Sequence, residues 1–233
     1  MFVSLEGPEG CGKTTQVALL EARLLARGYR VVSVHEPGGT DLGSHIRVLL
    51  LGHQGPPLDP WAEALLFSAC RAQLVAEVIR PALAEGAFVV ADRFADSTLA
   101  YQGAARGLAR DDLDALIRIA TGGLRPDVTL LLDIPADAGL KRVMASGKRT
   151  FDPRPQLWFQ PSFFDESDAF QTLEARWSRF EAEPLEFHER VRNAYLDLAR
   201  ADPSRWAILD ATQPVEGVGA AAWAVVEARL SQP

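Results

Sequence analysis

A glycine-rich segment near the start of the chain constrains the fold more than any other feature. It reads Gly7, Pro8, Glu9, Gly10, Cys11, Gly12, Lys13, Thr14, which matches the pattern GxxxxGK[ST]. An apolar run, Phe2 to Glu6, precedes it, and a helical pattern, Thr14 to Ala26, follows it. Glycines let successive backbone N–H groups turn toward one anion, and the start of a helix adds positive potential. The sequence therefore predicts a phosphate-binding loop between a strand and a helix.

The rest of the chain alternates short β-rich runs with longer helical patterns, which favours a parallel sheet. The predicted strands are Phe2 to Glu6, Arg30 to His35, Phe88 to Asp92, Thr129 to Asp133 and Trp206 to Asp210. The predicted helices span residues 14–26, 44–51, 60–85, 110–121, 136–145, 173–201 and 215–230. We expect an α/β P-loop NTPase fold with a five-stranded parallel sheet flanked by helices and a lid.

All 233 residues are expected to form one domain, because the periodic elements follow one another without a linker. The segment from Gly147 to about Gln171 breaks the pattern with prolines and aromatic residues. We interpret residues 139–181 as a lid region, with an insert at about 148–177.

Composition excludes several classes of protein. The chain has 21 Arg and 3 Lys against 31 acidic residues, a net charge of −7, which disfavours binding to long nucleic acid. Two cysteines without metal-ligand spacing argue against a disulfide framework or structural zinc. Apolar runs are too short for a membrane span and no signal-peptide pattern is visible, so we expect a cytoplasmic protein without a membrane partner.

The residues around the loop suggest nucleotide chemistry. Lys13 is placed to reach the outer phosphates, and the Thr14 hydroxyl to bind Mg²⁺. Asp92 ends an apolar strand, which suits support of the Mg²⁺ shell, although a helix N-cap is the alternative. The adjacent Arg93 could clamp a second phosphate.

A P-loop alone does not distinguish a kinase from a switch or a motor. A GTPase would be expected to carry an NKxD element, but the only asparagine is Asn193. A kinase with a small acceptor needs a second anion site and a lid bearing arginine. Arg47, Arg71 and Arg93, together with the lid region, could supply them.

Several motifs make the sequence resemble the thymidylate kinases of the nucleoside monophosphate kinase group, bacterial type. They are the loop extended to Glu6 and Thr15, Glu36-Pro37-Gly38-Gly39-Thr40, Phe67 with Arg71, Asp92-Arg93-Phe94, Ser97-Thr98, Tyr101-Gln102-Gly103 and Asp210-Ala211-Thr212-Gln213-Pro214. The likeness covers about residues 1–147 and 178–230.

This resemblance implies that the protein transfers the γ-phosphoryl group of ATP to dTMP, giving dTDP and ADP, and that the reaction requires Mg²⁺. It also implies that the protein is a homodimer. Residues 7–15 would bind ATP, and Phe67 would stack on thymine. Arg71 would bind a thymine carbonyl, and Tyr101 would crowd the sugar 2′ position. The rest of the base edge would be read by Ser97, Thr98 and Gln102.

The resemblance also assigns charged roles. Arg47 and Arg93 would clamp the dTMP phosphate, and Glu9 would lie toward the sugar 3′-hydroxyl. Glu36 could assist Mg²⁺, position Arg93 or only form a turn. Besides Lys13 and Arg93, the catalytic cation of the lid would be Arg179 or, second, Arg149.

Two alternatives remain open at this stage. One is a kinase for another nucleoside monophosphate or a deoxynucleoside, which Phe67, Arg71 and Tyr101 disfavour. The other is a non-catalytic nucleotide-binding switch, which would hydrolyse ATP slowly without phosphorylating an acceptor.

Overall fold

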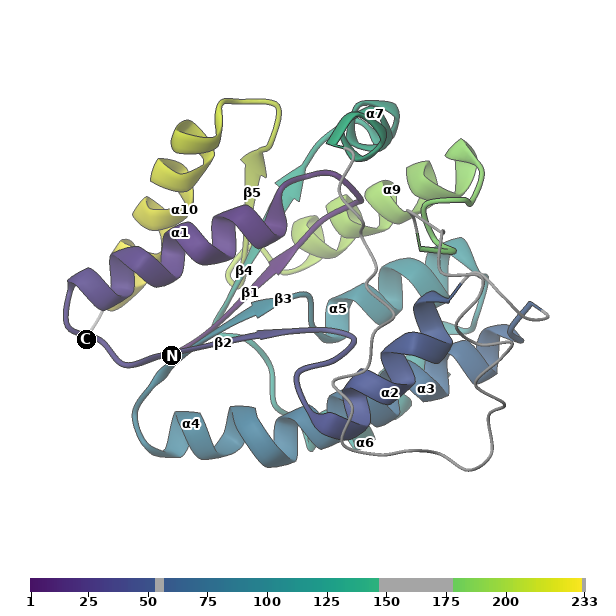
Figure 1. Ribbon diagram of the computed structural model, residues 1–233, viewed down its shortest axis with the longest axis horizontal. Helices are drawn as coiled ribbons and strands as arrows, with labels where there is room; N and C mark the ends of the chain where they lie inside the picture. Colours follow the sequence, from purple (N-terminus) through teal and green to yellow (C-terminus); the bar gives the residue numbers. More distant parts are fainter. Residues whose placement is uncertain (53–56, 147–177, 232–233) are drawn as a thin grey trace, which may run out of the picture.

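Five strands lie side by side in one parallel sheet in the order β2-β3-β1-β4-β5 (Figure 1). They are β1 (Phe2–Glu6), β2 (Val31–His35), β3 (Phe88–Asp92), β4 (Val128–Asp133) and β5 (Trp206–Asp210). The computed structural model describes residues 1–52, 57–146 and 178–231. The predicted α/β fold with a five-stranded parallel sheet is confirmed.

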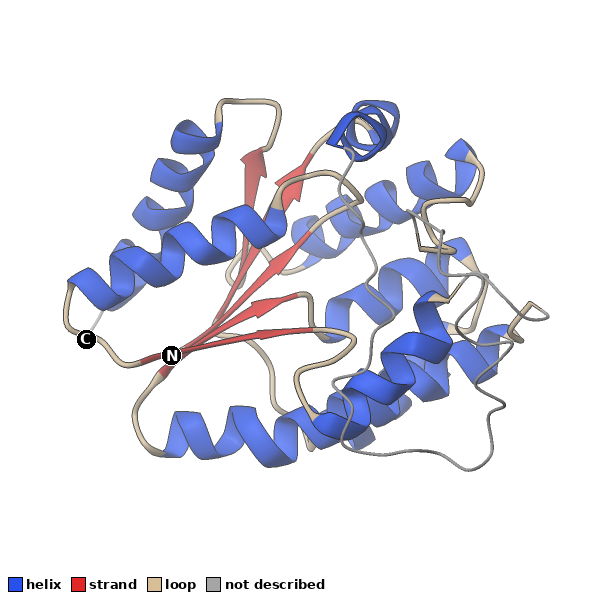
Figure 2. Cartoon of the chain, in the orientation of Figure 1, coloured by secondary structure: helices blue, strands red, loops and turns tan. Residues whose placement is uncertain are grey.

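Helices cover both faces of this sheet (Figure 2). They are α1 (Lys13–Ala26), α2 (Asp41–Leu51), α3 (Pro60–Leu74), η1 (Val75–Ile79), α4 (Arg80–Ala84), α5 (Ala95–Thr98), η2 (Leu99–Ala105), α6 (Arg110–Thr121), α7 (Ala136–Ser146), α9 (Leu185–Ala201) and α10 (Val215–Leu230). Helices α1 and α10 pack together on one face, and α4 and α9 lie on the other.

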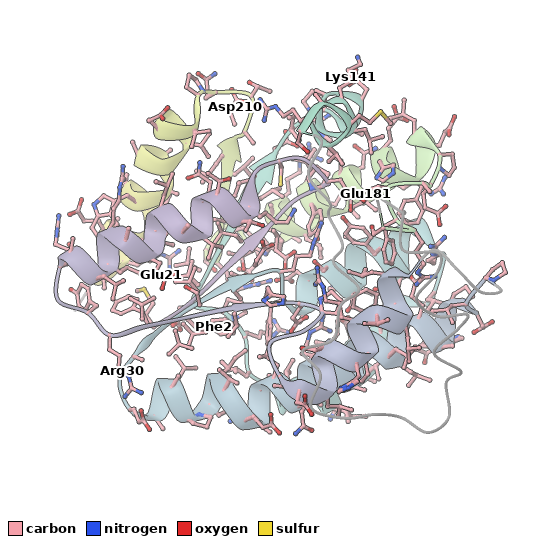
Figure 3. The ribbon with its side chains drawn as sticks, viewed as in Figure 1. Phe2, Glu21, Arg30, Lys141, Glu181 and Asp210 are labelled. Carbon is pink, nitrogen blue, oxygen red and sulfur yellow. The ribbon has the colours of Figure 1, made fainter. Side chains whose placement is uncertain are left out.

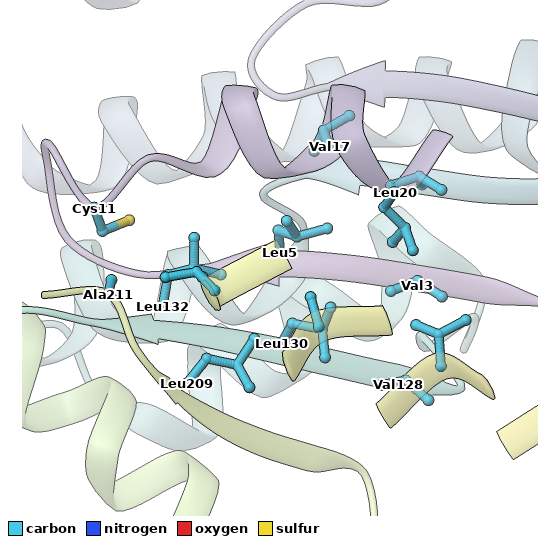
Figure 4. Close-up of a cluster of buried hydrophobic side chains, with 14 of the residues drawn as sticks. Val3, Leu5, Cys11, Val17, Leu20, Val128, Leu130, Leu132, Leu209 and Ala211 are labelled. Atoms are coloured by element: carbon cyan, nitrogen blue, oxygen red, sulfur yellow. The ribbon is translucent and has the colours of Figure 1, made fainter. Parts of the chain in front are cut away.

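Alternating side chains along the strands build a separate core on each face. Leu130 and Leu132 belong to the cluster under α1 and α10, together with Leu5 (Figure 4). Leu131 points to the opposite face, where it joins Tyr195 of α9. A strand that is covered on both faces needs apolar side chains on both. This explains why the predicted strands are apolar almost throughout.

Some predicted boundaries were wrong. The helix predicted over 60–85 contains a π-helical turn between α3 and α4. Residues 95–105, predicted as no element, form α5 and η2. Within the described residues, the helix predicted over 173–201 is present from Leu185 onward as α9. Pro184 lies directly before it, and a proline disfavours helical geometry in the residue that precedes it. The proposed insert at about 148–177 lies wholly outside the described residues.

The carboxyl ends of the strands meet at one edge of the sheet, where ligands bind in open α/β folds. Glu6, at the end of β1, leads into the glycine-rich loop, and Asp92 ends the neighbouring β3. The topology thus brings two sequence-distant motifs to one place.

Candidate functional site

A cleft with a volume of about 810 Å³ opens at this edge of the sheet. It collects most of the predicted site residues: Glu9, Gly10, Gly12, Lys13, Thr14, Thr15, Glu36, Arg47, Phe67, Asp92, Arg93, Ser97, Thr98, Tyr101 and Gln102. Arg71 and Arg179 are not part of its lining. Arg149 lies outside the described residues.

The glycine-rich loop wraps around the ammonium group of Lys13. Lys13 Nζ donates hydrogen bonds to the carbonyl oxygens of Gly7 and Pro8, at 3.2 and 3.0 Å. Gly10 has φ 70°, and a Cβ there would come within 2.0 Å of the Gly139 carbonyl oxygen, so only glycine fits. Cys11 is buried and packs in the hydrophobic core, as expected for a small residue that fills space beneath the loop.

Thr14 and Asp92 form a contact at the start of α1. Thr14 Oγ1 donates to Asp92 Oδ2 at 2.7 Å, and both residues line the cleft. A hydroxyl and a carboxylate are the hard oxygen donors that Mg²⁺ prefers, and Mg²⁺ usually keeps waters and substrate phosphates as its other ligands. This pair of oxygen donors therefore suits Mg²⁺. No group of three or more His, Cys, Asp or Glu that could hold a metal occurs among the described residues.

Arg93 has the most constrained conformation in the cleft. Its φ of 71° is in the left-handed region, which is uncommon for a residue other than glycine. Its Nη1 donates to the Gly7 carbonyl and to the Tyr195 hydroxyl, both at 3.0 Å. Its Nη2 donates to the Tyr101 hydroxyl at 2.9 Å and pairs with Glu9 at 3.4 Å. The guanidinium is therefore fixed before any ligand enters.

Glu9 reaches from the loop into the same network. Oε1 accepts a short hydrogen bond from the Tyr101 hydroxyl, and Oε2 lies 3.0 Å from Nδ1 of His188. Burial by itself raises the pKa of Glu9, but the His188 hydrogen bond and the charge of Arg93 outweigh it and lower the pKa to about 2. Glu9 is thus ionised at neutral pH.

Arg71 is buried under the cleft and is held by Glu36. The Nε and Nη2 atoms of Arg71 donate to the Glu36 carboxylate at 2.9 and 2.6 Å, and Nη1 donates to Thr98 Oγ1 at 2.9 Å. Arg71 is 1% exposed. Glu36 thus pairs with Arg71 and not with Arg93, a role that the sequence did not predict.

Aromatic rings form one end of the cleft, which Tyr101 connects to the loop through its hydrogen bond to Glu9. The Phe67 and Phe180 ring centroids are 6.0 Å apart, and those of Tyr101 and Phe180 are 5.7 Å apart. Gln102 lies beside them, and its Nε2 donates to Glu63 at 2.7 Å. This end combines flat apolar surfaces with a few polar groups, which suits a planar heterocycle.

Two further arginines line the cleft. Arg47 Nη1 donates to the Pro37 carbonyl at 2.6 Å. Arg142 of α7 donates to the Ala211 carbonyl at 2.8 Å, in the AspAlaThrGlnPro motif. Its neighbour Lys141 points away from the cleft (Figure 3) and pairs with Asp137. The Gly-Leu-Lys-Arg sequence thus contributes one cation to the cleft.

The structure places Arg179 away from the loop. Its Nη2 donates to buried Glu63 at 2.5 Å, and its Nε donates to the Leu50 carbonyl. Arg106 pairs with the same Glu63 carboxylate at 3.4 Å. Arg179 is therefore held at the aromatic end of the cleft and not beside Lys13.

Several residues of this network were not predicted from the sequence as site residues, namely Glu6, Glu63, Phe180, His188 and Tyr195. A usable signal existed on α9, where His188, Val191 and Tyr195 recur at helical spacing on its buried face. A polar residue on such a face needs a partner, and here the partners come from the loop and from β1.

Glu6 gives a prediction on pH. It is buried and accepts hydrogen bonds from the Phe94 N–H and the Ser97 and Tyr195 hydroxyls. Burial, with the nearby charge of Asp96, raises its pKa from 4.5 to about 7. The folded protein therefore keeps a proton that the unfolded chain releases, so stability falls as the pH rises from about 4.5 to 7.

At each pH we compare the free energy of unfolding of the wild type with that of Glu6→Gln. The wild-type value minus the variant value should fall by up to about 3 kcal/mol between pH 5 and pH 8. Urea titrations at each pH measure it. Glu189→Gln, at an exposed glutamate of α9, is the matched control and should follow the wild type. Parallel pH profiles for the wild type and Glu6→Gln would contradict the assignment.

Comparison with known proteins gives a consistent result. The profile of the thymidylate kinase family matches residues 5–163. The thymidylate kinase of Roseiflexus castenholzii is 46% identical, over 99% of this chain and 94% of the relative. That of Thermomicrobium roseum is 48% identical, over 97% of this chain and 93% of the relative.

A solved structure agrees. The crystal structure of thymidylate kinase from Ehrlichia chaffeensis matches with a TM-score of 0.69 and 29% identity, over 97% of this chain and 98% of that one. These relatives and this solved structure match nearly the whole chain. The chain therefore belongs to the thymidylate kinase family.

Proposed function

We propose that the protein transfers the γ-phosphoryl group of ATP to dTMP, giving dTDP and ADP. The observation that carries this proposal is a cleft lined by the phosphate-binding loop, by Arg47 and Arg93 and by Phe67. Arg93 contacts both the loop and Tyr101, and so connects the loop to the aromatic end of the cleft. This is the layout that a kinase with a small phosphorylated acceptor requires. Relatives of nearly half identity are named thymidylate kinases.

At the donor end, the loop N–H groups and Lys13 would hold the β- and γ-phosphates of ATP. Thr14 and Asp92 would hold Mg²⁺, which when bound neutralises phosphate charge. Their observed contact shows that both oxygen atoms already point to one spot in the cleft.

At the acceptor end, Arg47 and Arg93 would hold the phosphate of dTMP. Both terminal nitrogens of Arg93 donate to protein groups, so a phosphate would meet its Nε–H or displace one partner. Phe67 would stack on the base, and Tyr101 would limit space at the sugar. Thr98, Ser97 and Gln102 line the cleft near the base end, and Arg71 would act on the base from beneath, beside Thr98.

The transfer needs no general base, because the attacking oxygen of the dTMP phosphate is already anionic. A bond forms between that oxygen and the γ-phosphorus, and the bond from this phosphorus to the β,γ-bridging oxygen breaks. Orientation of the two phosphates and neutralisation of their charge therefore supply the catalysis. Lys13 and Arg93 both donate to the Gly7 carbonyl oxygen, so the two cations lie close together beside the loop.

The lid cation remains a proposal with two candidates. For Arg179 to meet the transferring group, its hydrogen bonds to Glu63 and Leu50 must break. The side chain would then have two positions, the observed one and one beside the transferring phosphoryl group. Arg149 lies outside the described residues. An arginine that meets the transition-state charge is worth on the order of 10³ in rate.

A coupled assay of ADP release tests the proposed function. With dTMP, dUMP, UMP, CMP, AMP and thymidine as acceptors, we expect dTMP to give the highest kcat/KM. Lys13→Ala should lower the rate at least about 10²-fold, because it removes the cation nearest the γ-phosphate. Lys141→Ala, on the outer side of α7, is the matched control and should keep wild-type rates.

Two outcomes would favour the alternatives. Activity on another monophosphate without activity on dTMP would identify a different kinase. Slow ADP release that no acceptor accelerates would indicate a nucleotide-binding switch.

The location of the protein belongs to the same proposal. None of the described helices is long and apolar enough to cross a membrane. A cytoplasmic site of action is proposed because the donor, ATP, is an intracellular nucleotide.

We also propose a homodimer, formed through helices α2, α3 and α6, which pack side by side (Figure 1). Large apolar side chains are exposed on them, namely Leu42, Leu49, Trp61, Leu65 and Ile119. An exposed apolar face of this kind is typical of an interface between subunits.

Sedimentation should give twice the 25.4 kDa chain mass for the wild type. Leu65→Asp should shift the protein to monomers, because it buries a charge in the interface. Leu25→Asp, on α1, is the control at similar exposure and should leave the dimer intact. A wild type that stays monomeric at tens of micromolar would refute the proposal.

A further inference from the structure

His188 lies directly behind the acceptor end of the cleft. It is on the first turn of α9, is 1% exposed and does not line the cleft itself. Its Nδ1 is 3.0 Å from Oε2 of Glu9, which does line the cleft. The proposed reaction gives His188 no role so far.

The chemistry of the pair fixes which ring nitrogen carries hydrogen. Ionised Glu9 can only accept hydrogen bonds, so Nδ1 of His188 must be the donor. Nε2 has no hydrogen-bond partner within the described part of the chain. The bond to Glu9 is thus the polar contact that offsets the cost of burying this ring.

The two oxygens of the Glu9 carboxylate have separate partners. Oε2 takes the His188 bond, while Oε1 takes the Tyr101 hydroxyl and the weaker contact with Arg93 Nη2 at 3.4 Å. The terminal torsion of a glutamate is broad, so one held oxygen leaves the carboxylate free to rotate. Holding both oxygens fixes the plane of the carboxylate.

We propose that His188 is a positioning residue for the acceptor: it fixes the Glu9 carboxylate, and through it the Tyr101 hydroxyl and the Arg93 guanidinium. This inference rests on the proposed function, in which Glu9 lies toward the sugar 3′-hydroxyl and Arg93 holds the dTMP phosphate. His188 would thereby set affinity for dTMP without touching it, and would leave ATP binding unchanged.

Calorimetric titration of dTMP and of ATP into single variants tests the assignment. His188→Phe keeps a ring but removes the donor, and should raise the Kd for dTMP about tenfold, as expected for loss of a hydrogen bond to a charged group. The Kd for ATP should change less than about twofold, since the loop amides and Lys13 are untouched.

A matched pair of amides separates the hydrogen bond from the packing of the ring. Asparagine places its amide nitrogen near the position of Nδ1, whereas glutamine places it near Nε2. His188→Asn should therefore retain dTMP affinity, and His188→Gln should lose it as His188→Phe does. This pair carries the test if His188→Phe does not fold.

A double-mutant cycle shows whether His188 acts through Glu9. In a Glu9→Ala background, His188→Phe should have almost no further effect on the Kd for dTMP. Additive effects, equal losses for dTMP and ATP, or equal behaviour of the two amide variants would overturn the proposal. If the wild type fails to bind dTMP, the proposed function fails instead, so the two failures are distinguishable.

Discussion

The geometry of the cleft depends on the conformation of Arg93. A left-handed residue other than glycine costs about 1–2 kcal/mol, and it persists only where its surroundings impose it. Here the Arg93 N–H donates to the Leu5 carbonyl at 3.0 Å, and its guanidinium is held by the loop, by η2 and by α9. The left-handed turn directs the side chain back over the end of β1. One residue thus joins the phosphate-binding loop to the acceptor end.

The two buried glutamates near Arg93, Glu9 and Glu6, have different roles. Glu9 stays ionised, and its charge faces the guanidinium at the cleft surface. Glu6 lies deeper and accepts hydrogen bonds from the Ser97 and Tyr195 hydroxyls, which orders them. Because burial raises its pKa to about 7, the folded protein loses stability as the pH rises toward 7. A buried acid retained at such a cost is typical of a functional site rather than of a core built for stability. Other arginines of the described chain pair at the surface instead; Arg30 (Figure 3), which precedes β2, pairs with the exposed Glu85.

The sequence predicted those parts of the protein that depend on local pattern. The strands and the place of the loop between β1 and α1 follow from apolar runs and a spaced motif. Thr14 and Asp92 were each predicted separately to bind Mg²⁺, and the fold brings them into contact. The π-helical turns at 75–79 and 99–105 could not be predicted, because they depend on packing between helices and not on periodicity. The roles of Glu36, Glu63 and His188 were missed for a similar reason: each is defined by a partner at least 35 residues away. Distant pairing of this kind becomes visible only when the sheet brings the segments together.

The central claim is that a preorganised Arg93 makes the acceptor end selective for a phosphorylated nucleoside. The most direct measurement is the ratio of the Kd for thymidine to the Kd for dTMP, in the wild type and in Arg93→Ala. Since a charge-assisted phosphate contact is worth about 1.5–3 kcal/mol, the substitution should reduce this ratio at least about tenfold, mainly by weakening dTMP. An unchanged ratio in a folded Arg93→Ala protein would contradict the account, because it would show that the phosphate is held elsewhere.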